Sequence, residues 1–132
     1  MKMKSSEPGK KTQDMYPDER LYDLGILEEM DDKEYIVEII SIFLNDTPGE
    51  LKEISTAATA RKMEIVSKTA HKLKNSAGAL QAKSLVYLLT EIETSAKAGC
   101  SNEEFIQLIE MTQQEYNNLE QALQLYLRNT GA

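Results

Sequence analysis

The feature that most constrains this chain is a seam of apolar residues that repeats at helical spacing. Between Lys62 and Leu80, small and apolar residues recur at steps of four, three, four and three positions: Val66, Ala70, Leu73, Ala77 and Leu80. Such a heptad-like repeat is typical of a helix packed lengthwise against others in a left-handed bundle. The seam therefore predicts an amphipathic helix with one buried face.

A second stripe of the same period starts after Asp32. Its members are Tyr35, Ile36, Ile39, Ile40, Phe43 and Leu44, followed beyond Pro48 by Leu51, Ile54, Ala58 and Arg61. Thr47 as N-cap and Pro48 as first helical residue would allow two helices here. We favour one long helix kinked at Pro48.

Two more helices follow the seam. Leu85, Leu88, Leu89, Ile92 and Ala96 form a stripe that ends at Lys97-Ala98-Gly99, a basic residue and a glycine as at many helix C-termini. Ser101 or Asn102 is the expected N-cap of the last helix, which ends near Arg128. Short turns make neighbouring helices antiparallel. We therefore predict an all-α, antiparallel up-down-up-down four-helix bundle, with a short helix before it around Asp23–Met30.

The length of 132 residues allows one domain. Residues 1–20 are rich in Lys, Ser, Pro and Gly and offer little to bury, which predicts a disordered tail. The bundle should occupy residues 21–130. The starting methionine and the full-length last helix favour a free-standing protein over a piece of a hybrid kinase.

Composition excludes several functions. A net charge of -7 argues against nucleic-acid binding, which depends on clustered Lys and Arg. Cys100 has no cysteine partner for an intramolecular disulfide, and one His with one Cys cannot supply the usual zinc ligands. No apolar run suits a membrane span or a signal peptide. We expect a cytoplasmic monomer without a membrane or nucleic-acid partner.

The only histidine, His71, is the residue that stands out. At about 100° per residue it falls roughly 140° from the centre of the seam, so it should face solvent. Its neighbours on that face are Glu64, Ser67, Lys68, Lys74, Asn75 and Gly78. Most exposed histidines have no function, but a neutral imidazole is a nucleophile, and a lysine three positions later can reach a phosphoryl group on the ring. Gly78 either starts the helix end or leaves room for a partner.

The stretch Ala70-His71-Lys72-Leu73-Lys74-Asn75-Ser76-Ala77-Gly78 resembles the signature of histidine phosphotransfer (HPt) domains, A-H-x-L-K-G-S-x-G. Phe43 to Pro48 is similar to the family's F-L-x-x-x-P stretch, and Leu85 to Glu93 to its L-x-x-x-x-x-x-L/I-E helix. The likeness covers roughly Tyr22 to Leu127. It implies the bundle fold and a carrier of phosphoryl groups in two-component phosphorelays.

By this resemblance His71 is the phosphoacceptor and Lys74 stabilises the phosphoryl oxygens. Glu93 stands where the family has a Gln or Glu that approaches the histidine from the next helix. It would accept the proton-bearing Nδ1–H and leave Nε2 as nucleophile; the alternative is a solvated surface charge. Lys97 could assist electrostatically, but we expect it to serve as a partner of the helix dipole.

Two positions depart from the family pattern. Asn75 replaces a glycine four residues after the histidine, and its side chain would either crowd a docking partner or hydrogen-bond to it. Gln81 replaces the glycine of the turn after this helix, so we expect that turn to close differently. Neither change removes the nucleophile or the lysine.

The resemblance implies response-regulator receiver domains as partners, with a hybrid sensor histidine kinase as a further candidate. Receivers should supply the acidic pocket and the Mg²⁺, so this chain needs no cofactor and is a carrier rather than an enzyme. Docking should use Glu64, Ser67, Lys68, Asn75 and Gly78, with Leu24, Ile26 and Leu27 nearby. The alternative is a helical adaptor that binds a receiver or kinase without being phosphorylated. An enzyme with His71 as general base is disfavoured, because a convex helix face offers no pocket.

Overall fold

The structure is a computed structural model that describes residues 21–100 and 102–130. Regular structure in these ranges is helical: α2 (Gly25–Glu28), α3 (Lys33–Thr59), α4 (Met63–Ala79), α5 (Lys83–Lys97) and α6 (Glu103–Asn129). The prediction of an all-α bundle with a short preceding helix is confirmed. The disordered tail over residues 1–20, and Ser101 as a cap, lie outside the described residues. None of the described helices has both the length and the apolar character that crossing a bilayer requires.

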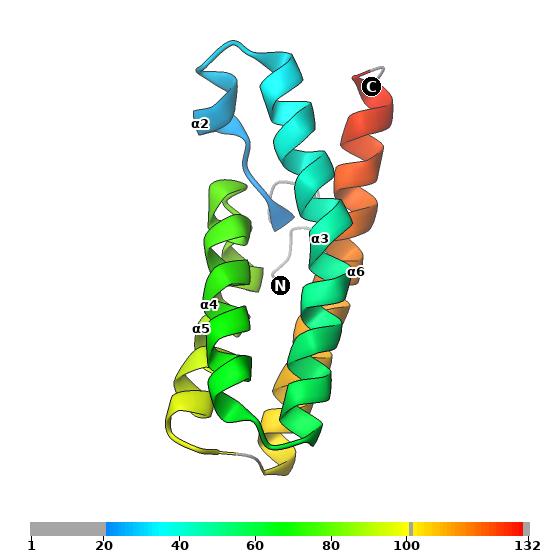
Figure 1. Ribbon diagram of the computed structural model, residues 1–132. Helices are drawn as coiled ribbons and strands as arrows, with labels where there is room; N and C mark the ends of the chain where they lie inside the picture. The colour runs from blue at the N-terminus through cyan, green and yellow to red at the C-terminus, as the bar shows by residue number, and fades with distance from the viewer. Residues whose placement is uncertain (1–20, 101, 131–132) are drawn as a thin grey trace, which may run out of the picture.

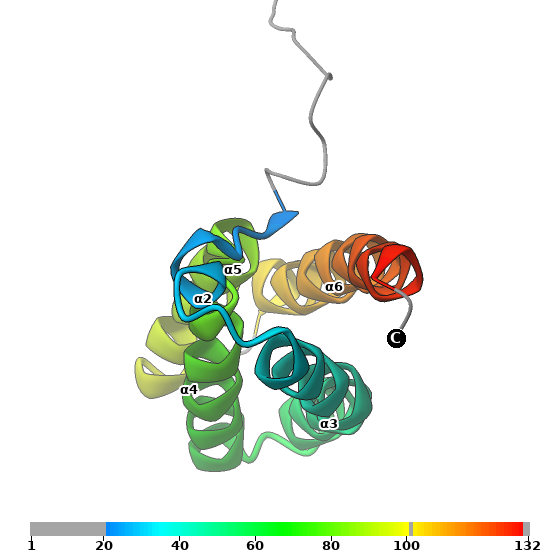
Figure 2. The ribbon, with the colours of Figure 1, turned by 90° about the horizontal axis from the view of Figure 1, so that it is seen from above.

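The four long helices form a ring in which each packs against the next (Figure 1). Helix α4 contacts α3 and α5, and α6 closes the ring by contacting both α5 and α3. Seen from above, α2 lies over the ends of α4 and α5 (Figure 2). The chain runs up and down through this ring, so the predicted antiparallel topology is confirmed.

Helix α3 is continuous from Lys33 to Thr59 with Pro48 inside it, which confirms the single-helix interpretation. Asp32 caps its start, because its Oδ1 accepts a hydrogen bond from the Tyr35 backbone N–H at 3.0 Å. Two expected members of its buried stripe, Tyr35 and Arg61, are exposed instead. Tyr35 lies in the first turn of α3 and Arg61 in the turn after it, so both are at the ends of the stripe.

Helices α3 and α6 are 27 residues each, whereas α4 has 17 and α5 has 15. The space beyond α4 and α5 is filled by α2 and the segment before it (Figure 1). The Asp23 backbone N–H donates to the Leu80 carbonyl at 2.9 Å, and Leu24 is buried. Tyr22 packs edge-on against Tyr126 of α6, with ring centroids 6.4 Å apart. The N-terminal segment thus covers one end of the core.

The seam of α4 is the centre of the core. Val66, Ala70, Leu73, Ala77 and Leu80 have no solvent exposure. Burying a leucine side chain stabilises a fold by about 1.5–3 kcal/mol, so these contacts hold α4 in one rotational setting. The opposite face of α4, which carries His71, must then face outward.

The turns after α3, α4 and α5 share one geometry. In the turn after α4, the Ala82 N–H reaches back to the Ala77 carbonyl and the Gln81 N–H to the Gly78 carbonyl. This pair of hydrogen bonds is the Schellman motif, which needs a residue in the left-handed conformation just past the helix end. That residue is Arg61, Gln81 or Gly99, with φ of 61, 55 and 78°. The expectation for Gln81 was wrong, because Gln81 itself adopts the left-handed conformation that a glycine would take.

Replacing Gln81 with glycine should therefore stabilise the protein. A residue with a Cβ strains in this conformation, whereas glycine does not, and we expect a gain of about 0.5–1 kcal/mol after glycine's greater unfolded-state freedom is subtracted. Urea denaturation of the Gln81→Gly variant measures it. Gly99→Ala is the control in the opposite direction, because it adds a Cβ at the equivalent position. That Cβ meets no atom within 4 Å, so the positive φ is the only source of strain. A Gln81→Gly variant less stable than wild type would contradict this account of the turn.

Candidate functional site

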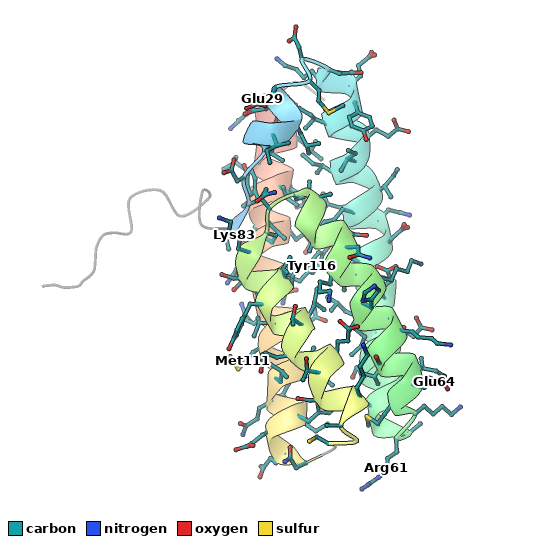
Figure 3. The ribbon with its side chains drawn as sticks, turned by 90° about the vertical axis from the view of Figure 1, so that its left-hand side faces the viewer. Glu29, Arg61, Glu64, Lys83, Met111 and Tyr116 are labelled. Atoms are coloured by element: carbon teal, nitrogen blue, oxygen red, sulfur yellow. The ribbon has the colours of Figure 1, made fainter. Side chains whose placement is uncertain are left out.

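His71 lies in the middle of α4 on the face opposite the buried seam. Its side chain is 56% exposed, so the prediction of a solvent-facing imidazole is confirmed. Figure 3 looks onto the surface formed by α4 and α5, with Glu64 projecting outward from α4. The imidazole is anchored by the helix but remains accessible to another molecule.

Glu93 reaches His71 from the adjacent helix α5. Its side chain is only 9% exposed, and its Oε2 lies 3.0 Å from His71 Nδ1. Its other oxygen, Oε1, accepts a hydrogen bond from Lys74 Nζ at 2.8 Å, and Lys97 Nζ lies 3.1 Å from Oε2. Glu93 is therefore not a solvated surface charge. It is a buried carboxylate shared by three nitrogen groups from two helices.

The surroundings of Glu93 keep it ionised. The hydrogen bond from Lys74 lowers its pKa most, burial opposes this, and Lys97 and His71 lower it further, to about 2. A carboxylate surrounded by ammonium groups accepts hydrogen bonds only. At neutral pH Glu93 thus carries a full negative charge against the imidazole.

An ionised Glu93 determines which ring nitrogen of His71 carries the proton. A neutral imidazole has one N–H donor and one lone-pair acceptor. Because the carboxylate can only accept, Nδ1 must be the donor in the 3.0 Å contact. Nε2 then holds the free lone pair on the side of the ring away from Glu93, where it can act as a nucleophile.

Lys74 lies one helical turn after His71 and is partly buried, with 24% of its side chain exposed. The structure therefore brings His71, Lys74 and Glu93 together, and the contact between Lys74 and Glu93 fixes where the ammonium group sits. A negative group attached to the imidazole would find this cation beside it.

The other residues expected at the docking face are on the surface around His71. Asn75 and the pair Glu64 and Lys68 are exposed, and Ser67 and Gly78 are partly so. The Glu64–Lys68 ion pair is 3.8 Å long with both side chains exposed, so it contributes little to stability. A Cβ added at Gly78 would meet no atom within 4 Å. Nothing inside the fold requires glycine there.

The predicted apolar part of this face needs correction. Leu24 is buried in the core and cannot contact a partner, although Ile26 is 63% exposed. An apolar groove of about 230 Å³ lies instead between α3 and α4, lined by Ile39, Ile42, Phe43, Asp46, Thr47, Glu50, Lys72, Ser76 and Ala79. Its signal in the sequence was Ile42, an isoleucine outside the buried stripe and 53% exposed.

Sequence reasoning also missed the contact of Lys97 with Glu93. The four-residue spacing of these oppositely charged residues on one helix was the available signal. Among the described residues, no group of three His, Cys, Asp or Glu side chains could hold a metal ion. The site therefore consists of one imidazole, one carboxylate and two ammonium groups.

Comparison with known proteins gives a family and a solved structure that are similar to this chain. The family model described as Hpt domain matches residues 38–124, more than half of the chain, and this range contains His71, Lys74, Glu93 and Lys97. Curated protein sequences gave no match. The crystal structure of histidine-containing phosphotransfer protein B from Pseudomonas aeruginosa PAO1 is similar, with a TM-score of 0.75 and 24% identity, covering 83% of this chain and 96% of that one. This likeness shows a shared fold.

The lowered pKa of Glu93 predicts a pH-dependent stability. A carboxyl group whose folded-state pKa is depressed stabilises the fold above its unfolded value, near 4.5, and this contribution disappears as pH falls through about 2. As the pH rises from 2 to 5, the free energy of unfolding of wild type should increase relative to that of Glu93→Gln by up to about 3 kcal/mol. Denaturant titrations of both proteins across this pH range measure the difference. A difference that does not change with pH would contradict the charged carboxylate.

Proposed function

This chain belongs to the Hpt domain family, and from that membership we propose that His71 accepts a phosphoryl group from a receiver-domain aspartate and passes it to another receiver. The observation that carries the proposal is the contact between the buried Glu93 carboxylate and His71 Nδ1, which leaves Nε2 exposed as a nucleophile. The proposal assigns the chain the role of a carrier in a two-component phosphorelay, not that of an enzyme.

In the proposed step the Nε2 lone pair attacks the phosphorus of the aspartyl phosphate. The N–P bond forms while the bond from phosphorus to the aspartate oxygen breaks, and its electron pair returns to the carboxylate. Because Nδ1 keeps its proton, the ring gains positive charge as the bond forms. Glu93, 3.0 Å from Nδ1, stabilises that charge, and Lys74 lies beside the phosphoryl oxygens. Transfer to a second receiver reverses these steps.

The surroundings of His71 favour an acidic partner. The chain carries a net charge of -7, but near His71 four lysines, Lys68, Lys72, Lys74 and Lys97, are paired with three glutamates, Glu64, Glu50 and Glu93, which leaves one positive charge in excess among these pairs. A local excess of positive charge attracts a surface with the opposite sign and speeds association. A receiver's acidic pocket, which would hold the Mg²⁺ for the reaction, has the required charge. The groove between α3 and α4 would add apolar contact.

The direct prediction is that His71→Gln abolishes phosphoryl acceptance without unfolding the bundle, since residue 71 faces solvent. Lys74→Ala should slow transfer or shorten the phosphohistidine lifetime, roughly tenfold for the loss of one charge-assisted contact. Incubation with a panel of phosphorylated receivers, followed by a test for acid-labile and base-stable label, measures both.

The same assay separates the alternative function. Label retained on His71→Gln would show that another residue is the acceptor. If wild type binds receivers but takes no label from any of them, the chain is instead an adaptor that is not phosphorylated.

Gly78 gives a separate prediction about docking. Gly78→Ala should leave the fold as stable as wild type or stabilise it by up to about 1 kcal/mol, because alanine favours a helix and the added methyl group meets open space. It should still slow phosphoryl transfer if a receiver approaches α4 closely there. Gly49→Ala on α3 is the matched control, since a Cβ at Gly49 also meets nothing within 4 Å. Equal transfer rates for the two variants would place the docking surface away from Gly78.

A further inference from the structure

Lys74 has two competing partners in the proposed reaction. In the unphosphorylated protein its ammonium group is 2.8 Å from Glu93 Oε1. A phosphoryl group on Nε2 would bring two further negative charges close to the same lysine. When Lys74 turns toward those oxygens, the buried Glu93 loses its shortest contact, and burying a charge without a partner is strongly unfavourable.

Lys97 is placed to take over. It contacts Oε2 of Glu93 at 3.1 Å, whereas Lys74 contacts Oε1, so the two lysines do not compete for one oxygen. His71 Nδ1 shares Oε2 with Lys97, so this oxygen keeps both contacts when Lys74 moves. Glu93 and Lys97 are also on the same helix, four residues apart, and their contact does not depend on α4.

We propose that Lys97 is a positioning residue that holds and neutralises Glu93 while Lys74 moves from the carboxylate to the phosphoryl group on His71. This inference rests on the proposed function of His71. It makes Glu93 a shared counter-ion: Lys74 and Lys97 bind it before transfer, and Lys97 and the His71 N–H hold it afterwards.

The charges of the site support this exchange. Glu93 remains ionised at neutral pH, because its pKa is lowered to about 2 by Lys74, against the effect of burial, and by Lys97 and His71. Without Lys97, Lys74 would be the only lysine on the carboxylate and would be held there more tightly. Lys97 therefore lowers the attraction that Lys74 must overcome to reach the phosphoryl oxygens.

A simpler role for Lys97 is interaction with the negative end of the α5 dipole, because it is the last residue of that helix. That role does not involve Glu93. The two roles therefore differ in one respect: a counter-ion effect disappears when Glu93 loses its charge, whereas a dipole effect does not.

A double-mutant cycle on the full chain tests the inference. Phosphorylated receiver is the donor, and both the rate of His71 labelling and the lifetime of the label are measured. Lys97→Met should slow labelling or shorten the lifetime roughly two- to fivefold, the range expected for one partly exposed ion pair, and Lys97→Arg should restore the wild-type value. In a Glu93→Gln background, Lys97→Met should change neither quantity. Lys83→Met, at the opposite end of α5 (Figure 3), is the matched control for losing one positive charge.

The results of this cycle distinguish a failure of the inference from a failure of the proposed function. If Lys97→Met has the same effect with Glu93 and with Gln at position 93, Lys97 does not act through the carboxylate and the inference is overturned. The inference is also overturned if Lys97→Met has the same labelling rate and label lifetime as wild type, or if Lys83→Met lowers them as much as Lys97→Met does. In both cases the proposed function stands, because wild type is still labelled. A wild type that takes no label overturns the proposed function and this inference together.

Discussion

The carboxylate of Glu93 is the group on which the rest of the site depends. It is almost fully buried yet ionised, and such a charge is tolerated inside a protein only when hydrogen-bond donors surround it. His71, Lys74 and Lys97 are those donors. By satisfying this one charge, the protein fixes the orientation of the imidazole, the proton on Nδ1 and the position of the Lys74 ammonium group against the same carboxylate. The geometry of the site and its local stability thus depend on the same contacts.

The fold makes that contact possible by bringing α4 and α5 close together. The seam of α4 contains Ala70 and Ala77, small residues that are fully buried. Smaller side chains at a contact allow two packed helices to lie closer together. Glu93 can therefore reach across to His71 and Lys74. The same seam turns His71 outward, so one buried face accounts for both the exposed imidazole and its buried partner, Glu93.

Much of this could be predicted from the sequence because helical periodicity is a local signal. The seam from Val66 to Leu80 and the end of α5 just before Gly99 needed no tertiary information. Tyr35 and Arg61 were misassigned because periodicity does not show that the two ends of the stripe are exposed. Gln81 was misjudged because glycine is the favoured residue at the left-handed position of a Schellman turn, but other residues can also adopt that conformation.

The site itself could be predicted only in part. Its residues came from resemblance to a family, and periodicity alone would have left Glu93 as a surface charge. Lys97 was consistent with either a dipole partner or an ion pair, and the 3.1 Å contact with Glu93 in the structure shows the ion pair. The groove beside Ile42 depends on how α3 and α4 pack, which no single helix pattern contains.

Because His71 is the only histidine in the chain, its ring nitrogens can be observed without interference from any other imidazole. The most direct test is a long-range ¹H–¹⁵N NMR spectrum of that ring before and after phosphorylation by a receiver. We expect the Nδ1–H tautomer in the free protein, its loss in Glu93→Gln, and a phosphorus atom bonded to Nε2 after transfer. A predominant Nε2–H tautomer in wild type, or phosphorus on Nδ1, would contradict it.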